Sequence, residues 1–132
     1  NWKQQLAYSA VSLNFYNRRP DFDLTALYNE MMARYAPYPP VGGTHPYASF
    51  THLDGYSAIY YTYVWSKAIA VDLFTRFKTS GLHDRTVAME YRRAVLAPGS
   101  SSDANALIES FLGRPLTLTS WSEELKSAVP SR

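Results

Sequence analysis

The first third of the chain carries apolar residues at the spacing of α-helices. Between residues 1 and 17 an apolar residue recurs every three or four positions, which predicts a helix that ends before Pro20. A second helix is predicted from Leu24 to about Tyr35, because Asp23 is placed to cap its first turn. Its expected buried stripe consists of Leu24, Leu27, Tyr28, Met31 and Met32.

Residues 36–46 interrupt this pattern. The segment contains four prolines and two glycines, Gly42 and Gly43, so neither a helix nor a central strand can form there. We therefore expect a loop, and loops of this length without structure of their own are often functional.

The longest apolar and aromatic run extends from Leu53 to Lys78. Its many tyrosine, isoleucine, valine and tryptophan residues favour a strand by propensity, whereas its length and its lack of turn residues favour a helix. We expect one long central helix, capped by Asp54 and stopped by Gly81.

Three shorter helices are predicted in the rest of the chain, the first ended by Pro98-Gly99 and the second by Gly113. They extend from Asp84 to about Leu96, from Ala104 to Leu112 after a cap at Ser102 or Asp103, and from Trp121 to about Val129 after a cap at Thr119 or Ser120. The sequence therefore predicts an all-α fold of about six helices, forming one domain over residues 1–132.

Three tyrosines within the predicted long helix form a row. Tyr56, Tyr60 and Tyr63 are spaced i, i+4 and i+7, so they fall within an arc of roughly 60° on one helix face, and His52 lies just before the same end. A phenol is a neutral hydrogen-bond donor at neutral pH, and an imidazole adds a donor or a cation. Donors aimed at an oxygen that becomes negative commonly contribute about 10²–10³ in rate. The row therefore suits electrophilic assistance in acyl transfer.

Aromatic residues at helical spacing are more often part of a core than of a site. Here, however, the helix faces that the three tyrosines do not occupy are themselves apolar, as expected of a helix buried on most sides. Phenols buried as plain core would need partners for their hydroxyl groups. A polar cleft on the tyrosine face resolves this conflict.

Composition narrows the function classes. The chain has 13 Lys and Arg against 11 Asp and Glu, and a net charge of +2 is too weak to favour nucleic acid or an acidic membrane. It has no cysteine, which excludes a disulfide framework. No apolar run approaches membrane-spanning length, and the start lacks both a Met and a signal-peptide core, so we interpret it as a cleavage point or internal boundary. A cytoplasmic protein is expected, with a periplasmic one as the alternative.

Residues 50–66, FTHLDGYSAIYYTYVWS, resemble the F-x-H…G-Y-x-A-x-Y-Y-x-Y-x-W-[ST] signature of the thimet oligopeptidase, oligopeptidase A and peptidyl-dipeptidase family. The resemblance extends over about residues 43–115. Its later parts are Asp72-Leu73-Phe74, Arg76-Phe77, Gly81-Leu82, the segment from Tyr91 to Ala97, and the segment from Phe111 to Pro115.

This resemblance implies a zinc metallopeptidase with a mostly helical fold split by a deep channel. In the family two histidines of H-E-x-x-H and a downstream glutamate bind zinc, and this sequence contains no H-E-x-x-H. The zinc would therefore be bound by residues absent from this chain. By the same resemblance Tyr63 and Tyr60 are catalytic, stabilising the oxyanion of the tetrahedral intermediate.

The resemblance also assigns substrate contacts. His52 and Tyr56 match residues that hydrogen-bond the backbone of the bound peptide, and Gly42 and Gly43 lie in a loop that resembles one contacting substrate. Many members of this family have two glycines and a longer link between the histidine and the first tyrosine, whereas here the link is only Leu53-Asp54-Gly55. Arg114 is expected to bond helix carbonyls rather than substrate.

The sequence as a whole predicts the C-terminal part of a metallo-oligopeptidase that hydrolyses short peptides. Its expected partners are those peptides and the missing N-terminal part of the enzyme, with no nucleic acid and no membrane. The chain alone is predicted to be inactive. The alternative is a non-catalytic helical module that binds a peptide or a partner through the same aromatic face.

Overall fold

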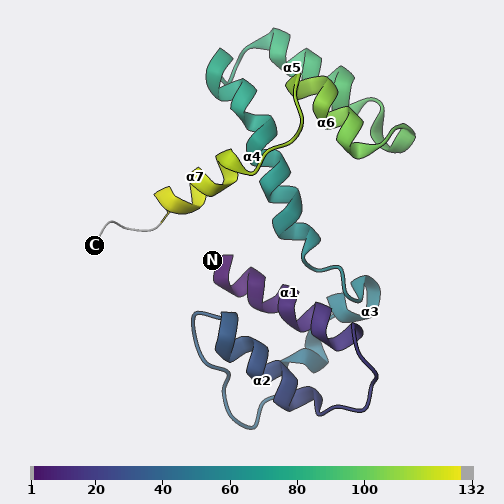
Figure 1. The fold of residues 1–132 in the computed structure, drawn as a ribbon, viewed down its shortest axis with the longest axis vertical. Helices are drawn as coiled ribbons and strands as arrows, with labels where there is room; N and C mark the ends of the chain where they lie inside the picture. The colour runs from purple at the N-terminus through teal and green to yellow at the C-terminus, as the bar shows by residue number, and fades with distance from the viewer. Residues whose placement is uncertain (1, 129–132) are drawn as a thin grey trace. The chain divides into compact units, whose positions relative to one another are not determined.

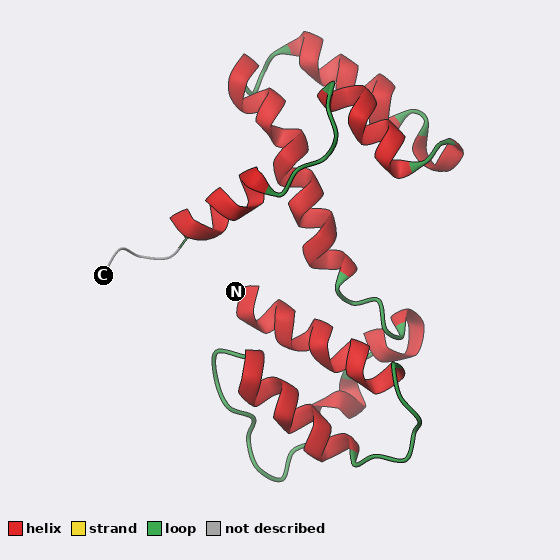
Figure 2. Cartoon of the chain, viewed as in Figure 1, coloured by secondary structure: helices red, strands yellow, loops and turns green. Residues whose placement is uncertain are grey.

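A computed structural model describes residues 2–128, and this range consists of helices joined by loops and turns, with no strand (Figure 2). The all-α fold is therefore confirmed. Seven α-helices are present in the described range, against about six predicted. They are α1 (Trp2–Tyr16), α2 (Leu24–Tyr35), α3 (His52–Tyr56), α4 (Thr62–Ser80), α5 (Arg85–Tyr91), α6 (Ala104–Leu112) and α7 (Thr119–Ser127).

The chain divides between Trp65 and Ser66 into two compact units, of which each is described by itself. The first unit contains α1, α2, α3 and the start of α4, and the second contains the rest of α4 and the later helices. The single domain predicted from the sequence stays a prediction.

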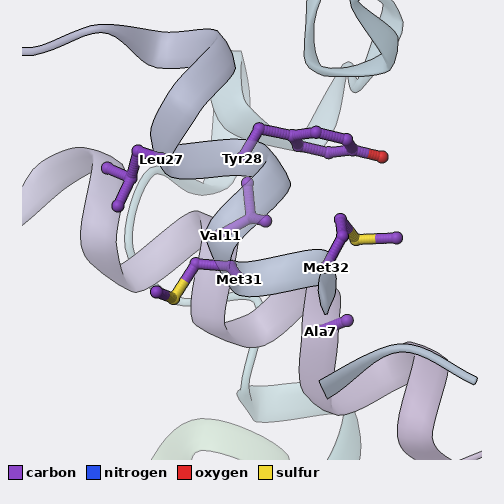
Figure 3. Close-up of a cluster of buried hydrophobic side chains, with 6 residues drawn as sticks. All are labelled: Ala7, Val11, Leu27, Tyr28, Met31 and Met32. Carbon is purple, nitrogen blue, oxygen red and sulfur yellow. The ribbon is translucent and has the colours of Figure 1, made fainter. Parts of the chain in front are cut away.

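In the first unit α1 and α2 run in opposite directions and share one core (Figure 1). The Asp23 carboxylate caps α2 as predicted, because its Oδ1 accepts the backbone amides of Thr25 and Ala26 at 2.8 and 3.0 Å. Leu24 is the exception to the predicted stripe, since it is exposed. Figure 3 shows the buried side chains of this core, which are Ala7, Val11, Leu27, Tyr28, Met31 and Met32.

The predicted loop after α2 is confirmed through residue 45, and it ends in a short 3₁₀ turn, η1 (Pro46–Ser49). Its end is held on α2, where the Thr25 hydroxyl lies 3.1 Å from His45 Nδ1 and 2.7 Å from the Tyr47 hydroxyl. The loop therefore leads directly into α3, which carries the first of the predicted site residues.

The single long helix predicted from Leu53 to Lys78 is wrong. The segment forms α3 and α4, separated by a turn in which Ser57 has a φ of 47°. Asp54 lies inside α3 rather than capping a helix, and Thr51 is the residue before its first turn. The predicted stop at Gly81 is confirmed, because α4 ends at Ser80 and Gly81 has a φ of 102°.

In the second unit local caps determine where the helices begin. The carboxylates of Asp84 and Asp103 each accept two backbone amides at the starts of α5 and α6, and Gly113 ends α6 in the left-handed conformation. After α5 the predicted helix continues as a π-helical turn, η2 (Arg92–Leu96), and a 3₁₀ turn, η3 (Gly99–Ser101), follows. The buried core of this unit consists of Leu73, Val87, Ile108 and Phe111.

A buried carboxylate on α4 organises the segment between α6 and α7. Asp72 has no solvent-exposed surface, and its two oxygens accept the Arg114 guanidinium at 2.7 and 2.8 Å. The Thr117 amide donates to the same carboxylate at 2.9 Å, and the Ser120 hydroxyl lies 3.4 Å from it. Arg114 therefore bonds a carboxylate, in addition to the carbonyl of Pro115, and not the helix carbonyls expected from the sequence.

The last helix begins differently from the prediction. Leu118 precedes α7 without a side-chain cap, so neither Thr119 nor Ser120 acts as the predicted cap. The Ser120 hydroxyl faces Asp72 instead. The predicted end near Val129 lies outside the described residues. Among the helices of residues 2–128, none has both the length and the apolar character that crossing a bilayer requires.

Asp72 is expected to make the stability of the second unit fall at low pH. The Arg114 hydrogen bonds hold the pKa of the Asp72 carboxyl below its usual range, although burial acts in the opposite sense. The folded state therefore favours the carboxylate. This contribution is complete above the unfolded pKa of about 4, and it is lost as the pH falls through the lower folded value.

We expect Asp72→Asn to lower the free energy of unfolding by about 2 kcal/mol at neutral pH, because charge-assisted hydrogen bonds are replaced by neutral ones. The variant should also lose less stability than the parent as the pH falls below about 4, measured by denaturant unfolding at a series of pH values. Glu123→Gln, at an exposed position of α7, is the matched control. An acid dependence identical in Asp72→Asn and the parent would contradict this role.

Candidate functional site

The structure brings four of the predicted site residues together from three consecutive elements. His52 and Tyr56 are the first and last residues of α3, Tyr60 lies in the connection after it, and Tyr63 lies in the first turn of α4. All four belong to the first unit. We call them the His–Tyr cluster.

The imidazole of His52 is at the centre of this cluster. Its ring centroid lies 5.8 Å from that of Tyr56, 5.0 Å from Tyr60 and 5.7 Å from Tyr63. The tyrosines also contact each other, with centroids 4.9 Å apart for Tyr60 and Tyr63 and 6.2 Å apart for Tyr56 and Tyr63. The predicted convergence of these side chains is therefore present.

The route to this convergence is not the predicted one, because the residues do not form a row on one straight helix. In a continuous helix His52 and Tyr63 would be separated by about 16 Å along the axis, too far for their rings to touch. The turn at Ser57 folds the chain back and removes this separation. In this turn the Tyr56 carbonyl accepts the Ile59 amide at 2.9 Å. This is the i to i+3 hydrogen bond of a β-turn, in place of the i to i+4 bond of an α-helix.

The cluster has one buried and two exposed phenols. Tyr60 is only 7% exposed, its ring packs against Tyr8 and Phe50, and its hydroxyl donates to Gln5 Oε1 at 3.2 Å. Tyr56 and Tyr63 are 47% and 44% exposed. The exposed phenols can therefore reach a ligand, while the buried Tyr60 packs against Tyr63.

The phenols of Tyr60 and Tyr63 stay protonated to higher pH than a free tyrosine. Desolvation raises the pKa of Tyr63, and the neighbouring phenol of Tyr56 raises it further. Burial likewise raises the pKa of Tyr60, with added repulsion between its phenolate and those of Tyr63 and Tyr8. Both hydroxyl groups are thus neutral hydrogen-bond donors across the physiological range.

A pocket of about 280 Å³ opens beside the cluster. His52 and Tyr60 form part of its wall, α1 and α2 each contribute one tyrosine, and η1 and the residue after it contribute the rest. The lining residues are Tyr8, Tyr28, Pro46, Ser49, Phe50, His52 and Tyr60. Such a mixture of apolar walls and a few polar groups is typical of small-ligand sites.

The structure does not bring the other two predicted substrate contacts to the cluster. Gly42 and Gly43 form an exposed turn in which Gly43 has a φ of 75°, a conformation that favours glycine. Neither residue lines the pocket beside His52. Their predicted contact with a substrate stays a prediction.

Residues 2–128 contain no group of three or more His, Cys, Asp or Glu side chains placed to hold a metal ion. The side chains described here therefore do not fit a zinc site. The imidazole of His52 is partly buried and interacts with the described residues through ring contacts.

Sequence reasoning did not identify Ser12, Gln5 and Tyr16, which contact this segment from α1. The Ser12 hydroxyl donates to the Ser57 carbonyl, and the Tyr16 hydroxyl donates to the Leu53 carbonyl. Their one signal is local, because polar groups at positions 5, 12 and 16 share one face of the predicted first helix.

Comparisons with known proteins agree on one group of enzymes. A family model described as peptidase family M3 matches residues 3–127. The chain is 36% identical to the thimet-like oligopeptidase of Dictyostelium discoideum over 88 residues, which are 66% of this chain and 13% of that protein. It is 32% identical to the mitochondrial intermediate peptidase of Coprinopsis cinerea over 96 residues, or 73% of this chain and 12% of that protein.

A bacterial relative is matched with a similar identity and over a similarly small share of its length. Oligopeptidase A of Escherichia coli is 35% identical to the chain over 77 residues, which are 57% of this chain and 11% of that protein. The chain thus spans between 11% and 13% of the length of these three relatives.

The contact between Tyr60 and Tyr63 generates a prediction for alkaline pH. Because folding favours the neutral phenols, these two tyrosines contribute to the free energy of unfolding. The contribution is fully present below the unfolded pKa of about 10, and it is lost as the pH rises through the raised folded values. Tyr63→Phe removes the neighbouring phenolate, so the pKa of Tyr60 should fall toward its ordinary value. Carbon NMR of the tyrosine rings during a pH titration measures this shift.

Tyr38→Phe, which removes an exposed phenol from the loop, is the control and should leave the Tyr60 titration unchanged. If Tyr63→Phe also left it unchanged, the two phenols would not share one electrostatic environment.

Proposed function

Because the chain belongs to peptidase family M3, we propose that it is the C-terminal part of a zinc-dependent oligopeptidase that hydrolyses short peptides. Its matched relatives are much longer and are named as peptidases, which supports a role inside a larger enzyme. The remaining part of that enzyme would be its principal partner. Its compartment, for which the sequence predicts the cytoplasm, stays a prediction.

The His–Tyr cluster is the observation that carries this proposal. Three phenols and one imidazole lie in ring contact, and two of the phenols are about half exposed. When a peptide bond is attacked, its carbonyl oxygen becomes negative, and neutral donors fixed nearby stabilise that charge. The cluster offers such donors without the cost of ordering them during the reaction.

We assign the oxyanion contact first to Tyr63. Its hydroxyl is accessible, and its raised pKa keeps the proton in place at neutral pH. Tyr60 is assigned a supporting catalytic role, because its hydroxyl already donates to Gln5 and could reach a substrate only by giving up that bond. The two tyrosines are therefore proposed to act unequally.

His52 and Tyr56 are proposed to hold the peptide backbone. An imidazole nitrogen and the exposed phenol of Tyr56 can each bond a peptide carbonyl or amide. Gly42 and Gly43 are proposed as further contacts, since their exposed turn has room to rearrange over a ligand.

The described residues do not fit zinc, so no step of the proposal goes through a metal held by this chain. Any zinc would be bound by residues outside it, and the chain alone is proposed to be inactive. The present side chains bind and orient the substrate and donate a hydrogen bond to its carbonyl oxygen.

The two exposed phenols and the adjoining pocket also fit a second function, the binding of a peptide or a partner without chemistry. In that case the tyrosine hydroxyls would affect affinity but not turnover. One substitution separates the two functions.

In the full-length enzyme, Tyr63→Phe should lower kcat by about 10²–10³-fold with little change in KM, because the lost hydrogen bond forms mainly in the transition state. Steady-state hydrolysis of a quenched fluorescent peptide measures both constants. Tyr61→Phe is the matched control, since it removes an exposed phenol next to the cluster but outside its ring contacts.

An unchanged kcat in Tyr63→Phe would remove this residue from the reaction, and a rise in KM alone would favour the binding function. The 132-residue chain alone, assayed on the same peptide with added zinc, should show no hydrolysis that a chelator abolishes.

A further inference from the structure

The turn between α3 and α4 has an unusual backbone. Ser57 has φ 47° and ψ −117°, close to the first central position of a type II′ turn, where glycine is the normal residue. It is the one residue other than glycine with a positive φ in the described chain. A side chain is strained in this conformation, which persists only where surrounding contacts enforce it.

Ser12 of α1 supplies such contacts at both ends of this turn. Its side chain is 1% exposed, its hydroxyl donates to the Ser57 carbonyl, and the Tyr60 amide donates to the Ser12 Oγ at 3.4 Å. In a continuous helix the Tyr60 amide would instead donate to the Tyr56 carbonyl. One buried hydroxyl therefore occupies the two backbone groups that would otherwise extend α3 into α4.

The same face of α1 holds Tyr60 at its other end. Gln5 lies two helical turns before Ser12 and accepts the Tyr60 hydroxyl at 3.2 Å. Tyr8, between them, packs its ring against that of Tyr60 at 5.8 Å. Tyr60 is thus held at its amide, its ring and its hydroxyl by one stripe of α1.

We propose that Ser12 is a positioning residue of the His–Tyr cluster, an inference that rests on the proposed peptide-binding role of that cluster. Ser12 donates to the Ser57 carbonyl and accepts the Tyr60 amide, so it acts on His52 and Tyr63 through Tyr60. By holding the strained turn it keeps the Tyr60 ring against both, so the imidazole and the accessible phenol of Tyr63 stay oriented together.

The test compares Ser12→Ala with the parent chain by NMR, with the ring signals of His52 as the readout. We expect Ser12→Ala to shift the His52 ring signals and the Tyr60 amide, and to lower the folding equilibrium constant about tenfold through the lost hydrogen bonds. Because Ser12 bonds the Tyr60 amide and the Tyr60 ring contacts that of His52, a change in the His52 ring reports transmission through Tyr60.

Two variants on α1 serve as controls. Ser9→Ala removes a hydroxyl that bonds only a carbonyl of its own helix, that of Gln5 at 2.8 Å, and should change nothing at His52. Val11→Ala destabilises the core of the same helix without removing a polar contact, and should also leave the His52 signals in place. Equal shifts in Val11→Ala and Ser12→Ala would reduce Ser12 to an ordinary stabilising residue and overturn the proposal.

Glycine at position 57 provides a rescue, because it relieves the strain that Ser12 opposes. Adding Ser57→Gly to Ser12→Ala should return the stability and the His52 signals toward those of the parent. If Ser12→Ala alone does not fold, folding of the double variant supports the proposal. A double variant that still fails to fold, or no shift at His52 in a folded Ser12→Ala, overturns it.

These measurements need no peptide, so they can fail independently of the proposed function. Ser12→Ala is then introduced into the full-length enzyme and its peptide hydrolysis is measured. A shifted His52 with unchanged kcat and KM would contradict the proposed role of the cluster while leaving Ser12 as the residue that positions it. An unshifted His52 would contradict the positioning role alone.

Discussion

The hydrogen bonds between Ser12 and the turn at Ser57 are the constraint on which the first unit depends. They occupy the Ser57 carbonyl and the Tyr60 amide, two groups that a continuous helix would use for its own ladder. With these groups engaged, α3 ends and α4 begins in a new direction. The resulting fold places the His52 ring within 6 Å of three tyrosine rings that a straight helix would spread along its length.

This arrangement gives a packed group of neutral donors, in which one phenol is anchored in the core and two phenols are accessible to a ligand. Tyr60 is buried and anchored to α1, whereas Tyr56 and Tyr63 are exposed. Rings that pack on each other lose little freedom when a ligand binds, which is the property expected of groups that must already be in place when charge develops. Membership of peptidase family M3 is consistent with the proposed role, in which these donors would bond a peptide carbonyl.

Local signals in the sequence were sufficient for many of the helices. Asp23 and Asp103 cap α2 and α6 as predicted, Asp84 caps α5, and glycine stops α4 and α6. The break after Tyr56 could not be predicted, because the partner that enforces it lies 45 to 48 residues away and no local residue type requires it. The same holds for Asp72, whose guanidinium partner lies 42 residues further along the chain. In both cases hydrogen bonds between residues far apart in the sequence determine the local structure, which the helical pattern of neighbouring residues does not predict.

The most direct test of the central claim is a set of nuclear Overhauser contacts among the rings of the 132-residue chain. We expect contacts from the His52 ring to the rings of Tyr56, Tyr60 and Tyr63 together, and an interruption of the helical contacts at Ser57. Unbroken helical contacts from His52 to Tyr63, with no contact between those two rings, would contradict the folded-back turn and the site built on it.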